Sequence, residues 1–122
     1  MAFDELTFLR EVKAKPGMYF GKKSLLGLRD LLGGMELGAA AALEDTGLPK
    51  KKLFPIWWDG FVPWYLEQYV KDENGYAAWW NHILYVSGNF DDSAFDNAFL
   101  VFDEYLKAEL HLPGLDEKRL AM

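Results

Sequence analysis

The fragment of this chain that comes nearest to a known catalytic motif is Gly17-Met-Tyr-Phe-Gly21-Lys22-Lys23-Ser24. Glycines, a lysine and a serine before a helix are the components of a phosphate loop, whose backbone N–H groups hold the phosphates of a nucleotide. That loop has four residues between its glycines and a lysine directly before Ser or Thr, and it follows a strand. Here three residues separate the glycines, a second lysine intervenes, and the preceding segment has a helical pattern. The sequence therefore predicts a structural turn and a helix cap, with at most weak anion binding and no nucleotide cofactor.

Histidines and carboxylates form no stronger catalytic or metal-binding pattern. The two histidines, His82 and His111, each lack a second ligand at metal-binding spacing. Asp92 and Asp96 are four residues apart, but a calcium loop needs more oxygen ligands at alternating positions. Neither Ser-x-x-Lys nor Gly-x-Ser-x-Gly occurs. We therefore expect a protein that is not an enzyme, with no catalytic residue, no metal and no other cofactor.

Tryptophan is the residue type that points most clearly to binding. The chain has five tryptophans, and Trp57-Trp58 and Trp79-Trp80 are adjacent pairs. Because neighbours on a helix point about 100° apart, one member of each pair can face solvent. An exposed tryptophan flanked by acidic residues suits a protein interface, and it also suits a sugar or a cationic ligand. The alternative is that most of the five tryptophans pack in the core of a small helical domain.

The charge is unevenly distributed along the chain. The formal net charge is −6, with nine Lys or Arg and seven Asp or Glu up to Lys52, but two Lys and ten Asp or Glu from Leu53 to Leu112. An excess of acid argues against nucleic acid as a partner, because phosphate contacts need clustered Lys and Arg. An acidic half can steer a basic partner toward it, or it can simply keep the surface solvated.

Length and composition indicate one domain over residues 1–122. An apolar fraction of 51% in 122 residues is enough for a hydrophobic core. The absence of cysteine favours a reducing compartment. No stretch approaches the roughly 18 to 20 apolar residues that span a bilayer, and the N-terminus has no signal-peptide pattern. We therefore expect a cytoplasmic protein that does not bind a membrane.

Hydrophobic periodicity predicts an all-α or nearly all-α bundle of about five helices. Ser24 is the expected N-cap of the second helix, which continues through the alanine run at residues 39–42. Two short segments, Met18–Gly21 and Leu53–Trp58, could instead pair with each other as strands. Gly47–Pro55 is expected to be a loop. The other helices are expected over Phe3–Ala14, Asp59–Val70, Tyr76–Val86 and Ala94–Leu110.

The stretch Lys15-Pro-Gly-Met-Tyr-Phe-Gly21-Lys-Lys-Ser24-Leu25 resembles a motif of small bacterial proteins. In that motif an N-terminal helix leads into a basic residue, Pro-Gly-Met-Tyr, an apolar residue and Gly, and then a Ser-Leu helix. The segments Trp58–Tyr69, Trp79–Leu84 and Asp91–Leu106 look like the later helices of that group. Such proteins resemble immunity or accessory proteins encoded beside polymorphic or contact-dependent toxins. The alanine run and the Lys50–Lys52 cluster depart from the pattern, and the resemblance assigns no catalytic residue.

These observations favour a non-catalytic protein that binds another protein. On the immunity hypothesis, an acidic, aromatic surface covers a basic bacterial toxin domain, with an exposed tryptophan as anchor. The alternative is a small-molecule or sugar-binding regulatory domain with a tryptophan-lined pocket. The residues predicted to bind the partner are Asp59, Glu67, Trp79, Asp91, Asp92 and Asp96.

Overall fold

The computed structural model describes residues 3–44, 46–47, 52–71 and 78–115, and within these ranges the regular structure is entirely helical. The all-α prediction is therefore confirmed. Along the chain the elements are α1 (Glu5–Ala14), α2 (Pro16–Phe20), α3 (Leu25–Glu44), η1 (Ile56–Phe61), α4 (Val62–Tyr65), η2 (Leu66–Val70), α5 (Ala78–Val86) and α6 (Asp91–Glu109). Segments η1 and η2 have the wider π-helical turn, and with α4 they form one continuous helix.

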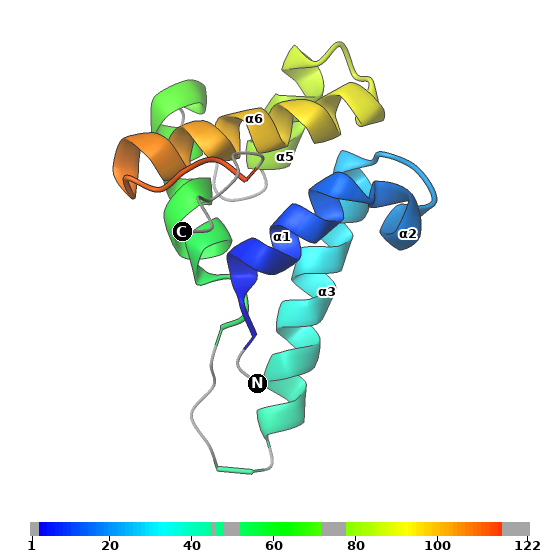
Figure 1. The fold of residues 1–122 in the computed structure, drawn as a ribbon, viewed down its shortest axis with the longest axis vertical. Helices are drawn as coiled ribbons and strands as arrows, with labels where there is room; N and C mark the ends of the chain where they lie inside the picture. The colour runs from blue at the N-terminus through cyan, green and yellow to red at the C-terminus, as the bar shows by residue number, and fades with distance from the viewer. Residues whose placement is uncertain (1–2, 45, 48–51, 72–77, 116–122) are drawn as a thin grey trace, which may run out of the picture.

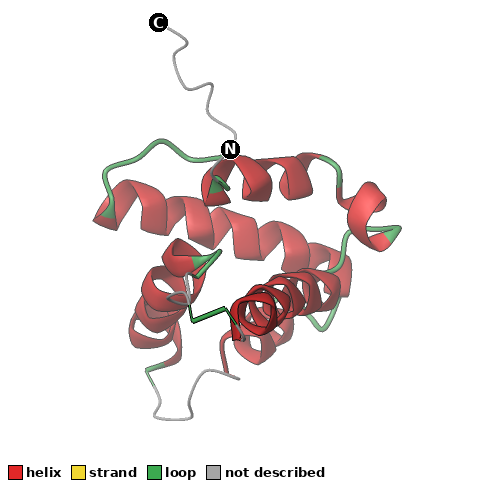
Figure 2. Cartoon of the chain, turned by 90° about the horizontal axis from the view of Figure 1, so that it is seen from below, coloured by secondary structure: helices red, strands yellow, loops and turns green. Residues whose placement is uncertain are grey.

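The helices pack around the N-terminal half of α3. Helix α3 contacts α5 and α6, α5 also contacts η2, and α2 folds against α1 and α3. Figure 1 shows α6 crossing near α5, while the C-terminal half of α3 extends away from the other helices. The perpendicular view in Figure 2 shows the same helical composition with only short loops between several elements.

The first three helices begin and end where local sequence directs them. Asp4 is the N-cap of α1, since its Oδ1 accepts a hydrogen bond from the Thr7 N–H at 3.1 Å. Helix α1 ends before Pro16, as predicted, but Pro16 then starts α2, so the strand alternative for Met18–Gly21 is wrong. Proline is well suited to the first turn of a helix because its missing N–H would have no partner there. Ser24 caps α3 as predicted, with its Oγ accepting the Gly27 N–H at 2.9 Å.

The third predicted helix starts earlier than expected, at Ile56 and not near Asp59. The strand alternative for Leu53–Trp58 is therefore wrong, and Pro63 lies inside the helix, not in its first turn. Because proline has no N–H to donate, it interrupts the regular hydrogen-bond ladder. Wider π turns stand on both sides of it, in η1 and η2. Such turns accommodate a local break while the helix continues.

The last two helices differ from prediction only at their ends. Helix α5 stops at Val86, as predicted, because Gly88 and Asn89 take left-handed conformations with φ of 72° and 64°. Its predicted start at Tyr76 lies outside the described residues. Helix α6 begins at Asp91 and not at Ala94, and its N-cap is Phe90.

An aromatic cluster centred on Trp57 forms the middle of the core. The Trp57 side chain is fully buried. Its ring centroid lies 4.8 Å from that of Phe61, 4.9 Å from that of Phe102 and 5.6 Å from that of Trp79. These rings come from three different helices, so Trp57 ties η1, α5 and α6 together.

Candidate protein interface

Trp79 is not the exposed anchor that the sequence predicted. Its side chain is 2 % exposed, and its ring packs edge-on against Trp57 and Trp58 at centroid distances of 5.6 and 5.9 Å. The prediction was wrong because α5 turns this side toward the core and presents Tyr85 and Val86 to solvent instead, 73 % and 58 % exposed.

Asp91 has a structural role at the start of α3. Its Oδ2 accepts a hydrogen bond from Ser24 Oγ at 2.5 Å, and its Oδ1 accepts the Leu26 N–H at 3.0 Å. A carboxylate at this position also interacts favourably with the positive end of the helix dipole. Asp91 therefore joins the beginning of α6 to the beginning of α3, and only part of its charge is available to a partner.

The other predicted carboxylates are exposed but do not form one face. Asp92 and Asp96 lie near Asp91 at the start of α6, where Asp96 pairs with Lys23 at 3.1 Å. Asp59 pairs with Lys52 at 2.7 Å. Lys52 lines a cavity with Leu37 of α3. Leu37 lies eleven residues after Leu26, whose backbone N–H donates to Asp91. At about 1.5 Å per residue, about 16 Å of helix separates the two regions.

Glu67, the last predicted acidic site, lies exposed on η2. The six predicted residues therefore comprise one core tryptophan, one helix-capping aspartate and four exposed carboxylates on three separate elements. Sequence counts gave the sign of the charge but not which carboxylates are already bound within the fold.

Replacing Asp91 with alanine is expected to lower the free energy of unfolding by about 0.5–2 kcal/mol, the usual range for loss of a helix cap. The Leu26 N–H and Ser24 hydroxyl would both lose their acceptor. Asp92→Ala is the matched control, because it removes the same charge from the adjacent exposed position. Urea denaturation of both variants makes the comparison, and equal losses would show that Asp91 contributes only charge.

A groove between α5, α6 and η2 is lined mainly by apolar and aromatic side chains. We call it the α5–α6 groove. Its volume is about 310 Å³. It is lined by Tyr65, Tyr69, His82, Ile83, Val86, Asn97, Leu100 and Val101.

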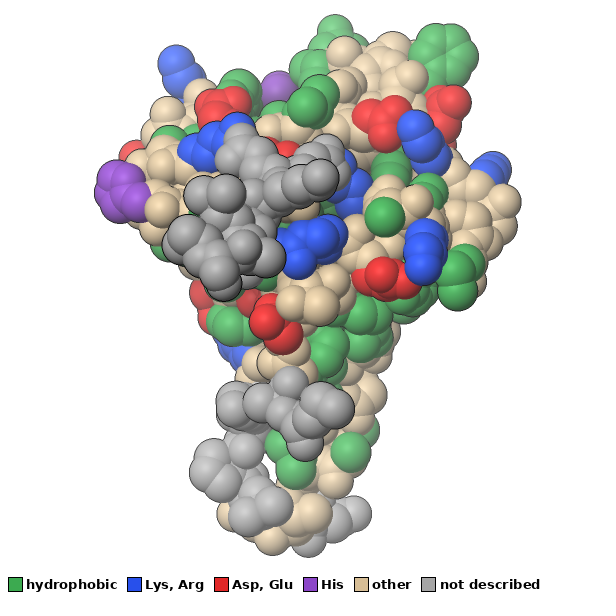
Figure 3. Space-filling model, in the orientation of Figure 1, with side chains coloured by type: hydrophobic (Ala, Val, Ile, Leu, Met, Phe, Trp, Pro, Cys, Tyr) green, Lys and Arg blue, Asp and Glu red, His purple; other side chains and the backbone are tan. Residues whose placement is uncertain are grey.

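Large apolar side chains stand exposed at the rim of this groove. Leu100 is 64 % exposed and Tyr69 is 41 % exposed, and Val86 joins them from α5. Phe90, between α5 and α6, is 66 % exposed. Figure 3 shows hydrophobic side chains gathered over the connection between α5 and α6, at the upper right. Grouped exposed apolar residues of this kind mark interaction sites more often than isolated ones do.

Two tyrosine hydroxyls, those of Tyr65 and Tyr69, form hydrogen bonds with polar side chains in and beside the groove. Tyr65 Oη lies 2.6 Å from His82 Nδ1, and burial, with a smaller effect of Tyr69, raises the pKa of Tyr65. Tyr69 Oη donates to Glu104, with its two carboxylate oxygens at 2.6 and 2.7 Å. That hydrogen bond raises the pKa of Tyr69 to about 12. The Tyr65 and Tyr69 rings are stacked with their centroids 5.1 Å apart. The hydrogen bond from Tyr69 therefore holds the Glu104 carboxylate beside this pair of rings.

Sequence reasoning did not predict a binding site at the residues of this groove. Leu100 and Val101 fall beside the buried stripe of α6 that Phe95, Phe99 and Phe102 define. An apolar residue outside the stripe of an amphipathic helix was the available signal. Such a residue indicates a binding surface only when other elements, here α5 and η2, place further apolar residues beside it.

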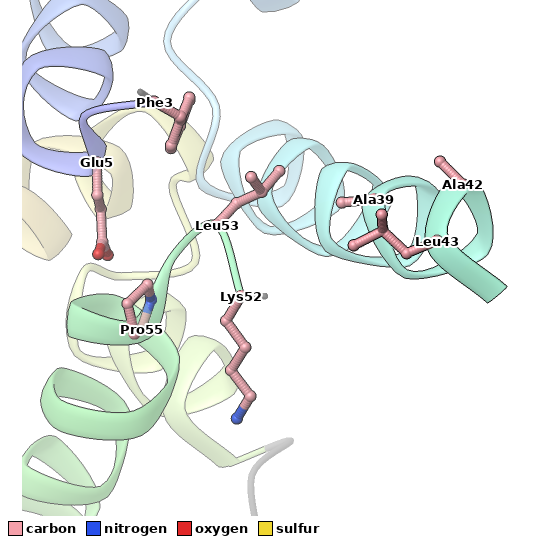
Figure 4. A pocket seen from close by; sticks show the side chains of 8 residues that line it. All are labelled: Phe3, Glu5, Ala39, Ala42, Leu43, Lys52, Leu53 and Pro55. Carbon is pink, nitrogen blue, oxygen red and sulfur yellow. The ribbon is translucent and has the colours of Figure 1, made fainter. Parts of the chain in front are cut away.

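A second cavity, of about 470 Å³, lies beside Glu5, between the N-terminal segment, the end of α3 and the segment before η1. Figure 4 shows Glu5 directed toward the start of the helix at Pro55. Its Oε1 and Oε2 accept the Ile56 and Trp57 N–H groups at 2.9 and 2.8 Å. Burial raises the pKa of Glu5 to about 7 against the lowering effect of these hydrogen bonds, and repulsion from Glu36 and Asp59 adds to the rise. Both oxygens of the Glu5 carboxylate therefore accept hydrogen bonds that stabilise the start of η1.

The tryptophan-pocket alternative finds less support in the geometry. Trp57 and Trp79 are core residues. Trp58 lines a cavity of about 350 Å³ with Gly33, Glu36, Leu37 and Lys52, but its indole N–H is buried and does not reach the surface. A sugar site usually combines an aromatic face with several polar groups aimed at hydroxyls, and Glu36 already accepts the Leu53 and Phe54 N–H groups.

The Gly17–Ser24 fragment contains most of the short helix α2, the left-handed Gly21 that ends it and the Ser24 cap of α3, so the prediction of a turn holds only for the residues after Phe20. Lys22 and Lys23 line a cavity together with Asp91 and Asp92, so carboxylates face the lysines and oppose an anion. In the part of the chain that the structure describes, no group of three or more His, Asp or Glu side chains is placed to hold a metal ion. None of the helices described is both long and apolar enough to cross a membrane.

Comparison with protein-family models, with curated proteins and with solved structures returned no match.

Proposed function

We propose that this chain is a non-catalytic binding protein whose partner is a basic protein domain. The observation that carries the proposal is the α5–α6 groove, an exposed apolar surface in the acidic half of the chain. Apolar contacts supply most of the affinity of a protein interface, and charge around them supplies the selection of partner and the association rate.

The charge of this half supports a basic partner. The described residues in 53–71 and 78–115 include eight Asp or Glu and two Lys. Some of these carboxylates pair with lysines from the N-terminal half, as Asp103 does with Lys13 and Asp96 with Lys23. The excess of acidic side chains that remains on α6 and η2 favours a cationic partner.

An immunity protein is the specific form of this proposal, on the strength of the Lys15–Leu25 resemblance. Such a protein must capture its toxin quickly inside the cell that makes it, and electrostatic steering accelerates capture. The proposal places the chain in the cytoplasm, where its lack of cysteine is typical. A sugar-binding regulator is the less supported alternative, because the fold uses two of the five tryptophans as fully or nearly fully buried core residues.

The test is affinity capture with the full chain from an extract of its source organism, followed by kinetic measurement on the purified partner. We expect a partner with a net positive binding surface. Steering predicts that its association rate falls about tenfold or more as salt rises from low to several hundred millimolar. Asp92→Lys should lower the association rate further, and thermal melting checks that this variant is folded. An acidic partner, or a basic partner whose association rate does not depend on salt, would contradict the proposal.

A further inference from the structure

Resting on the proposed function, we infer that the partner docks in the α5–α6 groove through a segment that places an aliphatic side chain beside a lysine or arginine. Four of the groove's lining residues are aliphatic, namely Ile83, Val86, Leu100 and Val101. The groove receives the aliphatic side chain, and Glu104 with Tyr69 at its edge receives the cation.

The size of the groove favours a side chain over a separate small molecule. Sites for drug-sized ligands and cofactors usually enclose roughly 300–1,000 Å³, and this groove, at about 310 Å³, is at the lower limit and open to solvent. Leu100 and Val86 are each more than half exposed. Exposed apolar side chains beside so small and open a groove are covered better by a protein segment lying across them.

The edge of the groove is suited to a cation. Glu104 accepts the Tyr69 hydroxyl hydrogen bond, but each carboxylate oxygen has two lone pairs, so Glu104 can still accept from an ammonium or guanidinium group. The Tyr69 ring, stacked on Tyr65, offers a face for a cation–π contact. None of the eight lining residues is Lys or Arg.

The same charges argue against a second copy of this chain as the occupant. A second copy brings a formal net charge of −6, and a contact between two identical grooves would place the Glu104 carboxylates on facing surfaces. Like charges across an interface disfavour association. A basic partner reverses the sign of this interaction.

The first experiment measures binding of synthetic 16-residue amphipathic peptides to the full chain by fluorescence anisotropy. The probe contains only leucine and lysine, and the comparison peptides replace either every lysine with glutamate or every leucine with serine. We expect the Leu/Lys peptide to bind at least tenfold more tightly than either comparison peptide. Equal binding of the Ser/Lys peptide would show attraction by charge alone and would overturn the inference, as would absence of binding by the Leu/Lys peptide at millimolar concentration.

The second experiment locates the site with matched variants. Leu100→Asn is expected to weaken Leu/Lys peptide binding tenfold or more, whereas Leu37→Asn, the same change at a leucine on α3 that is 74 % exposed, should leave it unchanged. Glu104→Gln should weaken binding severalfold and reduce its salt dependence, whereas Glu67→Gln, which removes the same charge from η2, should have the smaller effect. Equal effects within either pair would overturn the groove assignment.

The two levels of the proposal fail separately. A basic partner captured from the extract whose affinity is unchanged by both Leu100→Asn and Glu104→Gln would overturn the groove and leave the binding function standing. Peptide binding that follows the predicted pattern, with no basic protein captured from the extract, would keep the groove and remove the proposed partner class. Leu100 and Glu104 are exposed, so both variants should fold, and thermal melting checks this.

Discussion

Trp57→Ala is expected to lower the free energy of unfolding by about 3–5 kcal/mol, the usual cost of removing a buried large aromatic side chain. The Trp57 ring lies within 4.8 to 6.1 Å, between centroids, of four other core rings. These neighbours belong to η1, α5 and α6, and Phe61 and Phe102 also pack on each other at a centroid distance of 5.2 Å, which limits how far the rings can move into the space left by Trp57. A domain of this size has about 5–15 kcal/mol of stability in total, so the variant should be close to unfolding at 37 °C.

Two further substitutions separate packing from hydrogen bonding at this position. The Trp57 indole N–H is buried and has no hydrogen-bond partner among the described residues. Trp57→Phe removes that unpaired donor and keeps an aromatic ring, so it should cost clearly less than Trp57→Ala. Trp80→Ala is the control, because Trp80 is only partly buried and stacks under Arg29 at 4.3 Å. Urea denaturation gives all three values, and equal losses for Trp57→Ala and Trp80→Ala would show that Trp57 is not central to the core.

Glu5 should make the stability of this protein fall as the pH rises from about 4.5 to about 7. The pKa of Glu5 is raised by burial from about 4.5 to about 7 in the folded chain, so between these values the folded protein holds a proton that the unfolded chain has released. Stability decreases with pH wherever the folded state binds more protons. At about 1.4 kcal/mol per pH unit, the contribution of Glu5 declines by about 3 kcal/mol across this window and is constant above it.

The measurement is a urea denaturation series from pH 4.5 to pH 8 on the unaltered chain and on Glu5→Gln. Subtracting one curve from the other cancels the contributions of all other titrating groups, and the difference should fall by about 3 kcal/mol toward pH 8. Glu67→Gln is the control, because Glu67 is exposed and its substitution tests the loss of a carboxylate without burial. A difference curve for Glu5→Gln that is flat across this range would contradict the prediction.

The position of Glu5 also explains why the helix that contains Trp57 was predicted to start too late. Glu5 and Glu36 together accept four backbone N–H groups, those of Leu53, Phe54, Ile56 and Trp57. These carboxylates belong to α1 and α3, up to 52 residues away in the chain. Capping residues normally lie next to the helix in the sequence. Here they do not, so no local pattern at residues 53–57 predicts that the helix starts at Ile56.

The sequence by itself determined the elements whose signals are local. The periodic leucines and phenylalanines of α1, α3 and α6 predicted buried helix faces, and Ser24 predicted the start of α3. Such features depend on residues within one or two turns of each other, where rotamers, caps and chain breakers act directly. The all-α class and the end of α5 at Val86 follow from the same short-range physics.

Only the tertiary structure decided which side chains remain available for binding. Trp79 and Tyr85 stand on one helix, and the packing of α5 against α3, α6 and η2 buries the first and exposes the second. Asp91 and Asp92 are adjacent, and the approach of α3 engages the first as a cap while the second stays exposed. A helix pattern fixes the angle between neighbouring side chains, but the elements that pack around the helix fix which direction faces solvent. The apolar groove at Leu100 is therefore a property of three helices meeting, and no single segment of the sequence contains it.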